Sequence, residues 1–155
     1  AIAVGQKTGL AAPYYLARAQ FFDRKGEYRK ALPDYNQYDS LTHTVDPTFF
    51  YARYKCETKL RMWQQALLDI ARTCYLAPKE PTYFAEWASL DLRVKRIDEG
   101  ISAAKACINL APEYADGYLL LGLLQREKGL KQESIENLKK AQELGDTRAE
   151  EYLKQ

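Results

Sequence analysis

Histidine and cysteine are the residue types best suited to acid–base, nucleophilic or metal chemistry, and this sequence has few of them. His43 is the only histidine, and the three cysteines are Cys56, Cys74 and Cys107. A histidine can act as a general base or a metal ligand, but only with a nucleophile or further ligands placed around it. No such group surrounds His43 in the sequence, so we expect it to be an exposed loop residue.

The cysteine spacing also argues against a disulfide framework and against a zinc site, because the number is odd and no CxxC pair occurs. Cys74 and Cys107 fall near the seams of expected helices, where small buried thiols are ordinary, although a contact between the two is compatible with the sequence. Phosphate-loop, HExxH, EF-hand and GxSxG patterns are missing as well. We therefore predict no catalytic residue, no cofactor and no metal in this chain, and that it is not an enzyme.

The composition describes an ordinary globular chain of 155 residues, 46% apolar and 28% charged. A net charge of +2 is too small to favour a nucleic acid or a membrane surface as partner. The longest apolar run, residues 118–124, is too short for a membrane span, and no signal-peptide pattern opens the chain. We expect a protein or peptide partner, no nucleic acid and no membrane insertion. Because the first residue is not Met, we expect a fragment or a processed form, and the compartment stays unassigned.

Small and aromatic residues recur along the chain with a period of 34 or 35 residues. The small residues are Ala31, Ala66, Gly100 and Ser134. An aromatic lies sixteen residues before each of them, at Tyr15, Phe50, Phe84 and Tyr118, and a leucine lies ten residues after each, at Leu41, Leu76, Leu110 and Leu144. A period of this length is typical of tandem helical hairpins, in which each hairpin buries its apolar side against the next.

This period and pattern resemble the tetratricopeptide repeat family, whose signature places an aromatic, Leu-Gly, Tyr, Ala, Phe and Pro at fixed offsets. The best match is Tyr118, Leu121, Gly122, Ser134, Leu138 and Ala141, followed by Tyr15, Ala19, Phe22, Gly26, Ala31 and Tyr35. The middle repeats depart from the signature, with Tyr54 at a small position and with Glu57 and Asp91 at aromatic positions. The resemblance implies an all-α fold, a right-handed α-solenoid of stacked helix–turn–helix hairpins with a C-terminal capping helix.

The register predicts a single domain over residues 1–155. Its expected parts are a remnant of a preceding repeat (1–11), four repeats (12–46, 47–80, 81–114 and 115–146) and a capping helix (147–155). We expect paired helices at 13–25 and 28–41, 48–60 and 63–76, 82–94 and 98–110, and 115–128 and 131–144. Pro13 suits the first turn of its helix, whereas Pro33 removes a backbone donor, so we expect the 28–41 helix to begin late or to bend there.

In this family the first helix of each pair lines a concave groove that holds a partner. The resemblance assigns to this groove Leu16, Gln20, Asp23, Tyr51, Lys55, Thr58, Lys59, Ser89, Arg93, Leu119, Leu123 and Arg126. The Lys and Asn clamp with which some members capture a terminal carboxylate is absent, because the comparable sites hold residues such as Leu16, Gln20 and Tyr51. We predict that the chain binds an extended or helical segment of a partner protein, with Tyr51 as a candidate anchor.

The helix expected at 115–128 is apolar almost all round from Tyr118 to Leu124, which leaves two interpretations of Leu119 and Leu123. They form an apolar docking site, or the 147–154 helix shields them. A related alternative for the whole chain is a structural or assembly domain of a larger protein, which packs on a neighbouring domain or self-associates through the fourth repeat. A further alternative places a catalytic or regulatory part in flanking sequence.

Arg18 and Arg53 share one repeat position at which leucine is usual. Glu57 follows Arg53 by four residues, and Asp91 is the equivalent of Glu57 in the next repeat. We favour an ion-pair network in the helix seam over the alternative, an anionic ligand held by two guanidinium groups.

Overall fold

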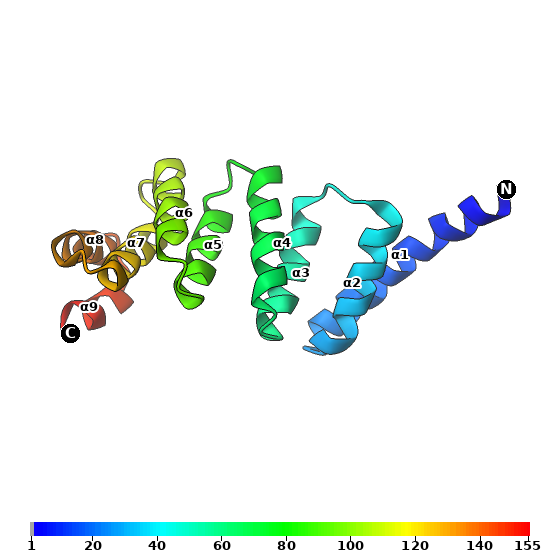
Figure 1. Cartoon of the computed structure of the whole chain (residues 1–155), viewed down its shortest axis with the longest axis horizontal. Coiled ribbons are helices and arrows are strands. Elements are labelled where there is room, and N and C mark those ends of the chain that lie inside the picture. The colour runs from blue at the N-terminus through cyan, green and yellow to red at the C-terminus, as the bar shows by residue number, and fades with distance from the viewer. Residues whose placement is uncertain (1) are drawn as a thin grey trace. The chain divides into compact units, whose positions relative to one another are not determined.

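The computed structural model describes the backbone of residues 2–155 and the side chains from Leu10 onward. Within the described residues, the regular elements are helices, and no strand occurs. The chain divides into two compact units, Ala1–Leu76 and Ala77–Gln155. Each unit consists of helical hairpins whose two helices run side by side in opposite directions (Figure 1).

The first unit contains two hairpins. They are formed by α1 (Ile2–Arg24) with α2 (Tyr28–Thr42) and by α3 (Pro47–Lys59) with α4 (Trp63–Leu76). Ala19 and Ala31 are fully buried, so α1 and α2 approach closely at this point. Tyr35 of α2 packs edge-on against Phe49 of α3, with ring centroids 5.7 Å apart, and thereby joins the two hairpins in one core.

The second unit contains two hairpins and a short closing helix. The elements are α5 (Pro81–Arg93), α6 (Ile97–Leu110), α7 (Ala115–Lys128), α8 (Lys131–Glu143) and α9 (Arg148–Leu153). α7 and α8 approach closely at Gly122, where an added Cβ would lie 2.9 Å from Leu138. Ser134 Oγ donates a 2.7 Å hydrogen bond to the Gly122 carbonyl there. Gly122 is therefore required by packing rather than by a turn.

The first helix of every hairpin ends in the same backbone turn. The residues in the left-handed conformation are Gly26, Arg61, Lys95 and Gly129, with φ of 73°, 59°, 63° and 87°. After each of them, the next amide donates to a carbonyl five residues back, as from Met62 to Glu57 at 2.9 Å and from Arg96 to Asp91 at 2.8 Å. This closure satisfies the last carbonyls of the helix and gives all four hairpins the same reversal.

Neither proline marks a helix start as expected, because Pro13 does not lie in the first turn of its helix and α2 does not begin late. α1 begins at Ile2 and passes through Pro13, and α2 begins at Tyr28 with Pro33 inside it. Proline has no backbone N–H, so the Arg29 carbonyl has no helical donor at position 33. Both Arg29 and Pro33 are exposed. Water can hydrate that carbonyl, so the helix continues at a cost that tertiary packing offsets.

The other paired helices begin and end within one residue of the predicted bounds, and the capping helix α9 is shorter than predicted. The four recurring small residues are all buried at the start of the second helix of a hairpin: Ala31, Ala66, Gly100 and Ser134. The assignment of residues 1–11 to a preceding repeat, and the repeat boundaries themselves, stay predictions.

Candidate functional site

The groove residues predicted on α1 differ in how far they are already engaged. Gln20 is exposed, whereas Leu16 packs against the core of the first unit. Asp23 is half-buried and accepts a 3.0 Å hydrogen bond from the Tyr35 hydroxyl. Asp23 thus helps to hold α2 against α1, and of the three groove residues predicted on α1, Gln20 is the one that is exposed.

The predicted residues on α3 form a continuous strip of aromatic and basic side chains. The Tyr51 ring stacks on Tyr54 with centroids 5.8 Å apart, and Lys55 Nζ lies 5.0 Å from the Tyr51 centroid. Tyr51 and Thr58 are half-buried, whereas Lys55 and Lys59 are exposed. Residues four apart share a helix face, so Tyr51, Lys55 and Lys59 present one side to a partner. We call Tyr51, Lys55, Thr58 and Lys59 the α3 strip.

In the second unit, the apolar docking interpretation of α7 is corrected by the structure. Leu119 is only 4% exposed and shares a core cluster with Leu138, Ala141 and Ala149. Leu123 is half-buried against the same cluster, together with Tyr152 and Leu153 of α9. The structure therefore agrees with the alternative interpretation, in which the C-terminal helix shields Leu119 and Leu123. The side of α7 that α9 covers is also the side considered above for self-association.

Arg126 is engaged by the same closing helix. Its guanidinium donates to the Tyr152 carbonyl at 2.6 Å and lies 5.7 Å from the centroid of the Tyr152 ring. Arg126 consequently caps the C-terminal end of α9 rather than facing a partner. Of the predicted groove residues on α5, Arg93 is exposed and Ser89 is half-buried.

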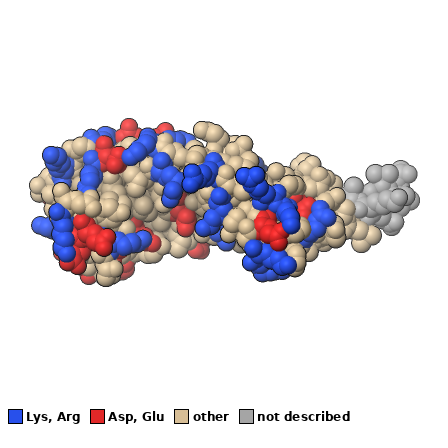
Figure 2. Space-filling model, turned by 90° about the horizontal axis from the view of Figure 1, so that it is seen from below, with Lys and Arg blue, Asp and Glu red and all other residues tan. Residues whose placement is uncertain are grey.

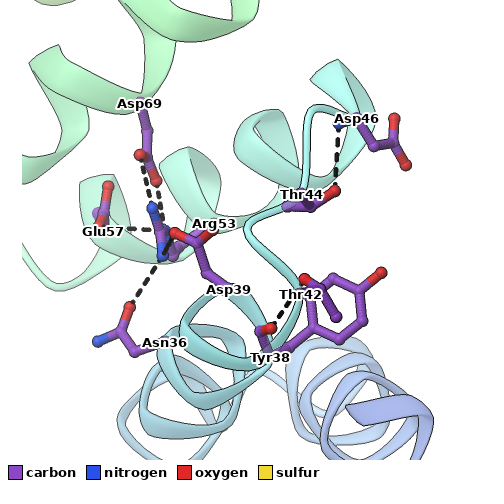
Figure 3. Close-up of polar contacts among 9 residues, drawn as sticks. All are labelled: Asn36, Tyr38, Asp39, Thr42, Thr44, Asp46, Arg53, Glu57 and Asp69. Atoms are coloured by element: carbon purple, nitrogen blue, oxygen red, sulfur yellow. Dashed lines mark hydrogen bonds and ion pairs between the residues drawn. The ribbon is translucent and has the colours of Figure 1, made fainter. Parts of the chain in front are cut away.

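Arg53 is the centre of a polar network that joins three helices of the first unit (Figure 3). Its Nε and Nη2 donate to the two Asp69 oxygens of α4 at 2.6 and 2.9 Å. Its Nη1 donates to Asp39 at 2.9 Å and to Asn36 at 3.2 Å, both on α2. Burial opposes the charge of Arg53, but the bonds to Asp69 and Asp39 outweigh it and raise its pKa. All three nitrogens of the guanidinium donate hydrogen bonds to Asp69, Asp39 or Asn36. An anionic ligand would therefore have to displace a carboxylate from Arg53.

Arg18 repeats the main part of this arrangement in the first hairpin. Its Nε and Nη2 donate to the two Asp34 oxygens at 2.6 and 2.7 Å. The seam interpretation of both arginines thus agrees with the geometry. The predicted partner Glu57 forms a long ion pair with Arg53, at 4.0 Å from Nε, and Asp69 and Asp39 are closer partners that we did not predict. The sequence did contain a signal for the right partners, since an aspartate follows each arginine by sixteen residues.

Two buried carboxyl groups have incomplete hydrogen bonding. Glu57 Oε2 has no hydrogen-bond partner, and neither oxygen of Asp91 accepts a hydrogen bond. Burial, reinforced by the neighbouring charge of Asp69, raises the pKa of Glu57. Burial also raises the pKa of Asp91 to about 6, against the opposing influence of Arg96. Both groups lie inside hairpins, so they bear on stability rather than on a ligand.

The three cysteines and His43 lie in surroundings that do not favour nucleophilic or metal chemistry. Burial raises the pKa of Cys56 and of Cys74 to about 12 and that of Cys107 to about 11, so all three stay thiols at neutral pH. His43 is exposed just after α2. Across the described residues, no three His, Cys, Asp or Glu side chains come together as a metal site. In that same part of the chain, no helix combines the length and apolarity that a membrane span requires.

Charge on the surface is mixed rather than segregated. Figure 2 shows basic and acidic side chains interspersed on the visible face of each unit. Several of these charges are paired within one unit. Lys95, in the turn after α5, lies 2.6 Å from Glu127 of α7, and Lys128 of α7 lies 2.7 Å from Asp98 of α6. Such exposed pairs contribute little to stability and leave no broad field of one sign.

Comparison with known proteins identifies the repeat directly in the fourth hairpin. The family model described as tetratricopeptide repeat matches residues 115–144, which include α7 and α8. No curated protein sequence matches the chain.

Solved structures extend the likeness to almost the whole chain. A MamA structure (residues 41 to the end) from Desulfovibrio magneticus RS-1 has a TM-score of 0.82 at 22% identity, covering 92% of this chain and 81% of that one. YrrB, described as a TPR protein with an unusual peptide-binding site, has a TM-score of 0.85 at 19% identity, covering 92% and 74%. TTC0263, a thermophilic TPR protein of Thermus thermophilus, has a TM-score of 0.65 at 20% identity, covering 88% and 75%. The expected all-α class of stacked helical hairpins is confirmed.

Proposed function

We propose that this chain, a protein with the tetratricopeptide repeat fold, binds a segment of a partner protein along the first helices of its hairpins, with the α3 strip as the centre of contact. Proteins of this fold are protein-interaction scaffolds rather than enzymes, which supports a general protein-binding role. YrrB has a peptide-binding site by its own description, and its fold is similar. The partner segment, its chemistry and the residues that hold it are our inference from the α3 strip.

The observation that carries the proposal is the pairing of a half-buried aromatic with two exposed lysines on one helix face. Tyr51 is held by its stacking on Tyr54, so its ring loses little conformational freedom when a partner covers it. Lys55 and Lys59 are exposed one turn apart beyond that ring. A partner segment with acidic side chains flanking an apolar or aromatic residue fits this combination, since the carboxylates meet the ammonium groups.

Another predicted groove residue extends the surface within the first unit. Gln20 of α1 is exposed and offers an amide that can pair with a peptide backbone. Leu119, Leu123 and Arg126 are left out of the proposed surface, because α9 engages them.

The proposal is tested with a peptide-display selection on the intact chain, followed by affinity measurement. We expect acidic peptides to be enriched, and we expect the charge reversal Lys55→Glu with Lys59→Glu to weaken their binding about tenfold or more. Tyr51→Ala should weaken it as well. The control reverses two exposed lysines of α8, Lys131→Glu with Lys139→Glu, which changes the net charge equally and should leave binding intact.

Two results would speak against the α3 strip. In one, the enriched peptides bind the Lys55 and Lys59 double variant as tightly as the parent chain. In the other, the selection enriches no acidic peptide, and Tyr51→Ala leaves the affinity of whatever is enriched unchanged. The circular dichroism spectrum of each variant shows whether its helix content is preserved.

A further inference from the structure

A groove opens at the edge of the first unit where the α1–α2 turn lies beside the α3–α4 turn (Figure 1). Its volume is about 430 Å³, and its lining consists of Arg29, Leu32, Pro33, Asn36, Leu60 and Met62. Leu32 is buried, and Leu60 and Met62 are half-buried, so the floor of the groove is apolar. We call these six residues the turn groove. Both of its walls belong to the first unit: one is α2, and the other is the turn after α3.

The equivalent place in the second unit is closed by an ion pair. By the repeat register, Arg29 and Leu60 correspond to Asp98 of α6 and Lys128 of α7. Lys128 Nζ lies 2.7 Å from Asp98 and so bridges the two helices at this position. An arginine and a leucine cannot form such a bridge. The turn groove therefore stays open, and Arg29 is exposed with no ion-pair partner among the described residues.

Two further polar groups of α2 at the turn groove can take up hydrogen bonds. Pro33 has no backbone N–H, so the Arg29 carbonyl has no helical donor at position 33. Asn36 Oδ1 accepts from Arg53 Nη1 at 3.2 Å, which leaves the amide nitrogen of the exposed Asn36 as a donor. An extended peptide backbone carries both an N–H and a C=O, so it can pair with the Arg29 carbonyl and the Asn36 amide together.

The edge around the turn groove carries an excess of positive charge within the otherwise mixed surface. Residues 24–30 and 60–62 contain five basic residues, all exposed: Arg24, Lys25, Arg29, Lys30 and Arg61. Glu27 is the acidic residue of these two segments, and it is paired with Lys30. The edge therefore favours a partner with negative charge.

We infer that the turn groove binds an extended segment of another protein in which an apolar residue is followed by acidic residues. The apolar side chain would lie over Leu32, Leu60 and Met62, a carboxylate would pair with Arg29, and a backbone N–H would donate to the Arg29 carbonyl. Inorganic phosphate fits less well, since it has no apolar part for the floor. The turn groove shares no residue with the α3 strip, so either proposal can fail without the other.

The test titrates the isotopically labelled 155-residue chain with capped hexapeptides and records its backbone amide resonances. The probes have the sequence Gly-Ser-X-Glu-Asp-Gly, with Leu, Met, Val or Phe at X. We expect at least one probe to shift the amides of Arg29, Leu60 and Met62, with a dissociation constant of about 1 mM or below. Replacing Glu-Asp in that probe by Gln-Asn should weaken it about tenfold, because the pairing with Arg29 is lost.

Three variants assign the contact. Arg29→Asp with Leu60→Lys installs the residues of Asp98 and Lys128, so it should bridge the groove and weaken the acidic probe about tenfold or more. Arg29→Gln should make the acidic and amide probes bind equally. Pro33→Ala supplies the Arg29 carbonyl with a helical N–H, so it should weaken the probe several-fold. Because Pro33→Ala should also make α2 more stable, unfolding cannot explain that loss.

Two control variants leave the turn groove untouched. Asp98→Asn with Lys128→Gln breaks the ion pair at the equivalent place in the second unit, and it should leave the affinity for the acidic probe unchanged. Tyr51→Ala removes the aromatic of the α3 strip and should also leave it unchanged.

Several outcomes would overturn the inference. One is that no probe shifts the amides of Arg29, Leu60 and Met62. Another is that Arg29→Asp with Leu60→Lys, or Pro33→Ala, binds the acidic probe as tightly as the parent chain. Loss of binding in Tyr51→Ala would move the contact to the α3 strip. Displacement of the acidic probe by an equal concentration of inorganic phosphate would reduce the site to anion binding at the basic edge.

Discussion

Asp91 occupies in α5 the position that Glu57 occupies in α3, and both carboxyl groups are buried at the ends of first helices. Glu57 is 3% exposed and Asp91 is fully buried. Their closest cations differ, since Arg53 Nε lies 4.0 Å from Glu57 and Arg96 Nε lies 3.7 Å from Asp91. Arg53 is already committed to Asp69 and Asp39, so Glu57 gains little from it. The two hairpins therefore respond differently to pH.

The parent chain should lose stability at alkaline pH, and the Glu57→Gln variant should not. The pKa of Glu57 is raised from 4.5 to about 8 in the folded chain, first by burial and then by Asp69, so its protonated form favours folding. That contribution is complete below 4.5 and is lost as the pH rises through about 8. Urea unfolding across this range should show the parent chain weakening, and Glu57→Gln should be more stable at alkaline pH by roughly 1–3 kcal/mol. Equal pH dependence in the two proteins would contradict the assignment.

Asp91→Asn should reduce the pH dependence of the free energy of unfolding between acidic and neutral pH. Burial raises the pKa of Asp91 from 3.8 to about 6, with Arg96 opposing and Glu99 reinforcing the shift. The stability that the protonated group contributes is therefore lost between these two values as the pH rises. The measurement is urea unfolding at acidic and neutral pH. Arg96→Gln is the companion variant, and it should move the loss of stability to higher pH, because it removes the charge that lowers the pKa.

Arg53→Lys should destabilise the chain more than Arg18→Lys does. A lysine cannot match both oxygens of Asp69 while also reaching Asp39, so buried acceptors lose partners, at a cost of about 1–3 kcal/mol. Arg18 makes the equivalent pair with Asp34, but its side chain is 43% exposed and water can replace the lost bonds. Thermal unfolding of both variants gives the comparison. A larger loss for Arg18→Lys would show that exposure does not control the difference.

Arg61→Gly should stabilise the chain. Arg61 has a φ of 59° in the turn after α3, a conformation that costs an L-residue roughly 1 kcal/mol and that glycine adopts freely. The equivalent turns at Gly26 and Gly129 already use glycine. We expect the midpoint of urea unfolding to rise, with the slope unchanged. Gly26→Arg is the reverse substitution, and it should lower the midpoint; a rise there would contradict the argument.

Ala149→Glu should detach α9 and uncover the apolar side of α7. Ala149 is fully buried in the cluster with Leu119 and Leu138, so a glutamate there would bury an unpaired charge. We expect lower stability and increased binding of a hydrophobic dye such as ANS. Glu151→Ala is the control, because Glu151 is exposed on the same helix and should change neither property. Unchanged dye binding by Ala149→Glu would mean that α9 does not shield Leu119.

Periodicity was enough to predict the hairpins, because helix pairing depends on residues close together in sequence. The small residues at Ala31, Ala66, Gly100 and Ser134 recur at nearly constant spacing, and each is buried in the structure. Proline was a weaker guide, since Pro13 and Pro33 lie inside helices that packing elsewhere sustains.

The sequence by itself determined the number, order and limits of most helices, through a repeat that aligns small residues, aromatics and turns. Only the tertiary structure decided which side chains remain available. It showed that α9 covers Leu119 and Leu123, that Asp69 and Asp39 bind Arg53 more closely than Glu57 does, and that Tyr14 and Phe21 stay exposed. The physical reason is that burial and hydrogen-bond partners depend on contacts between helices, which a residue's own position along the chain does not specify.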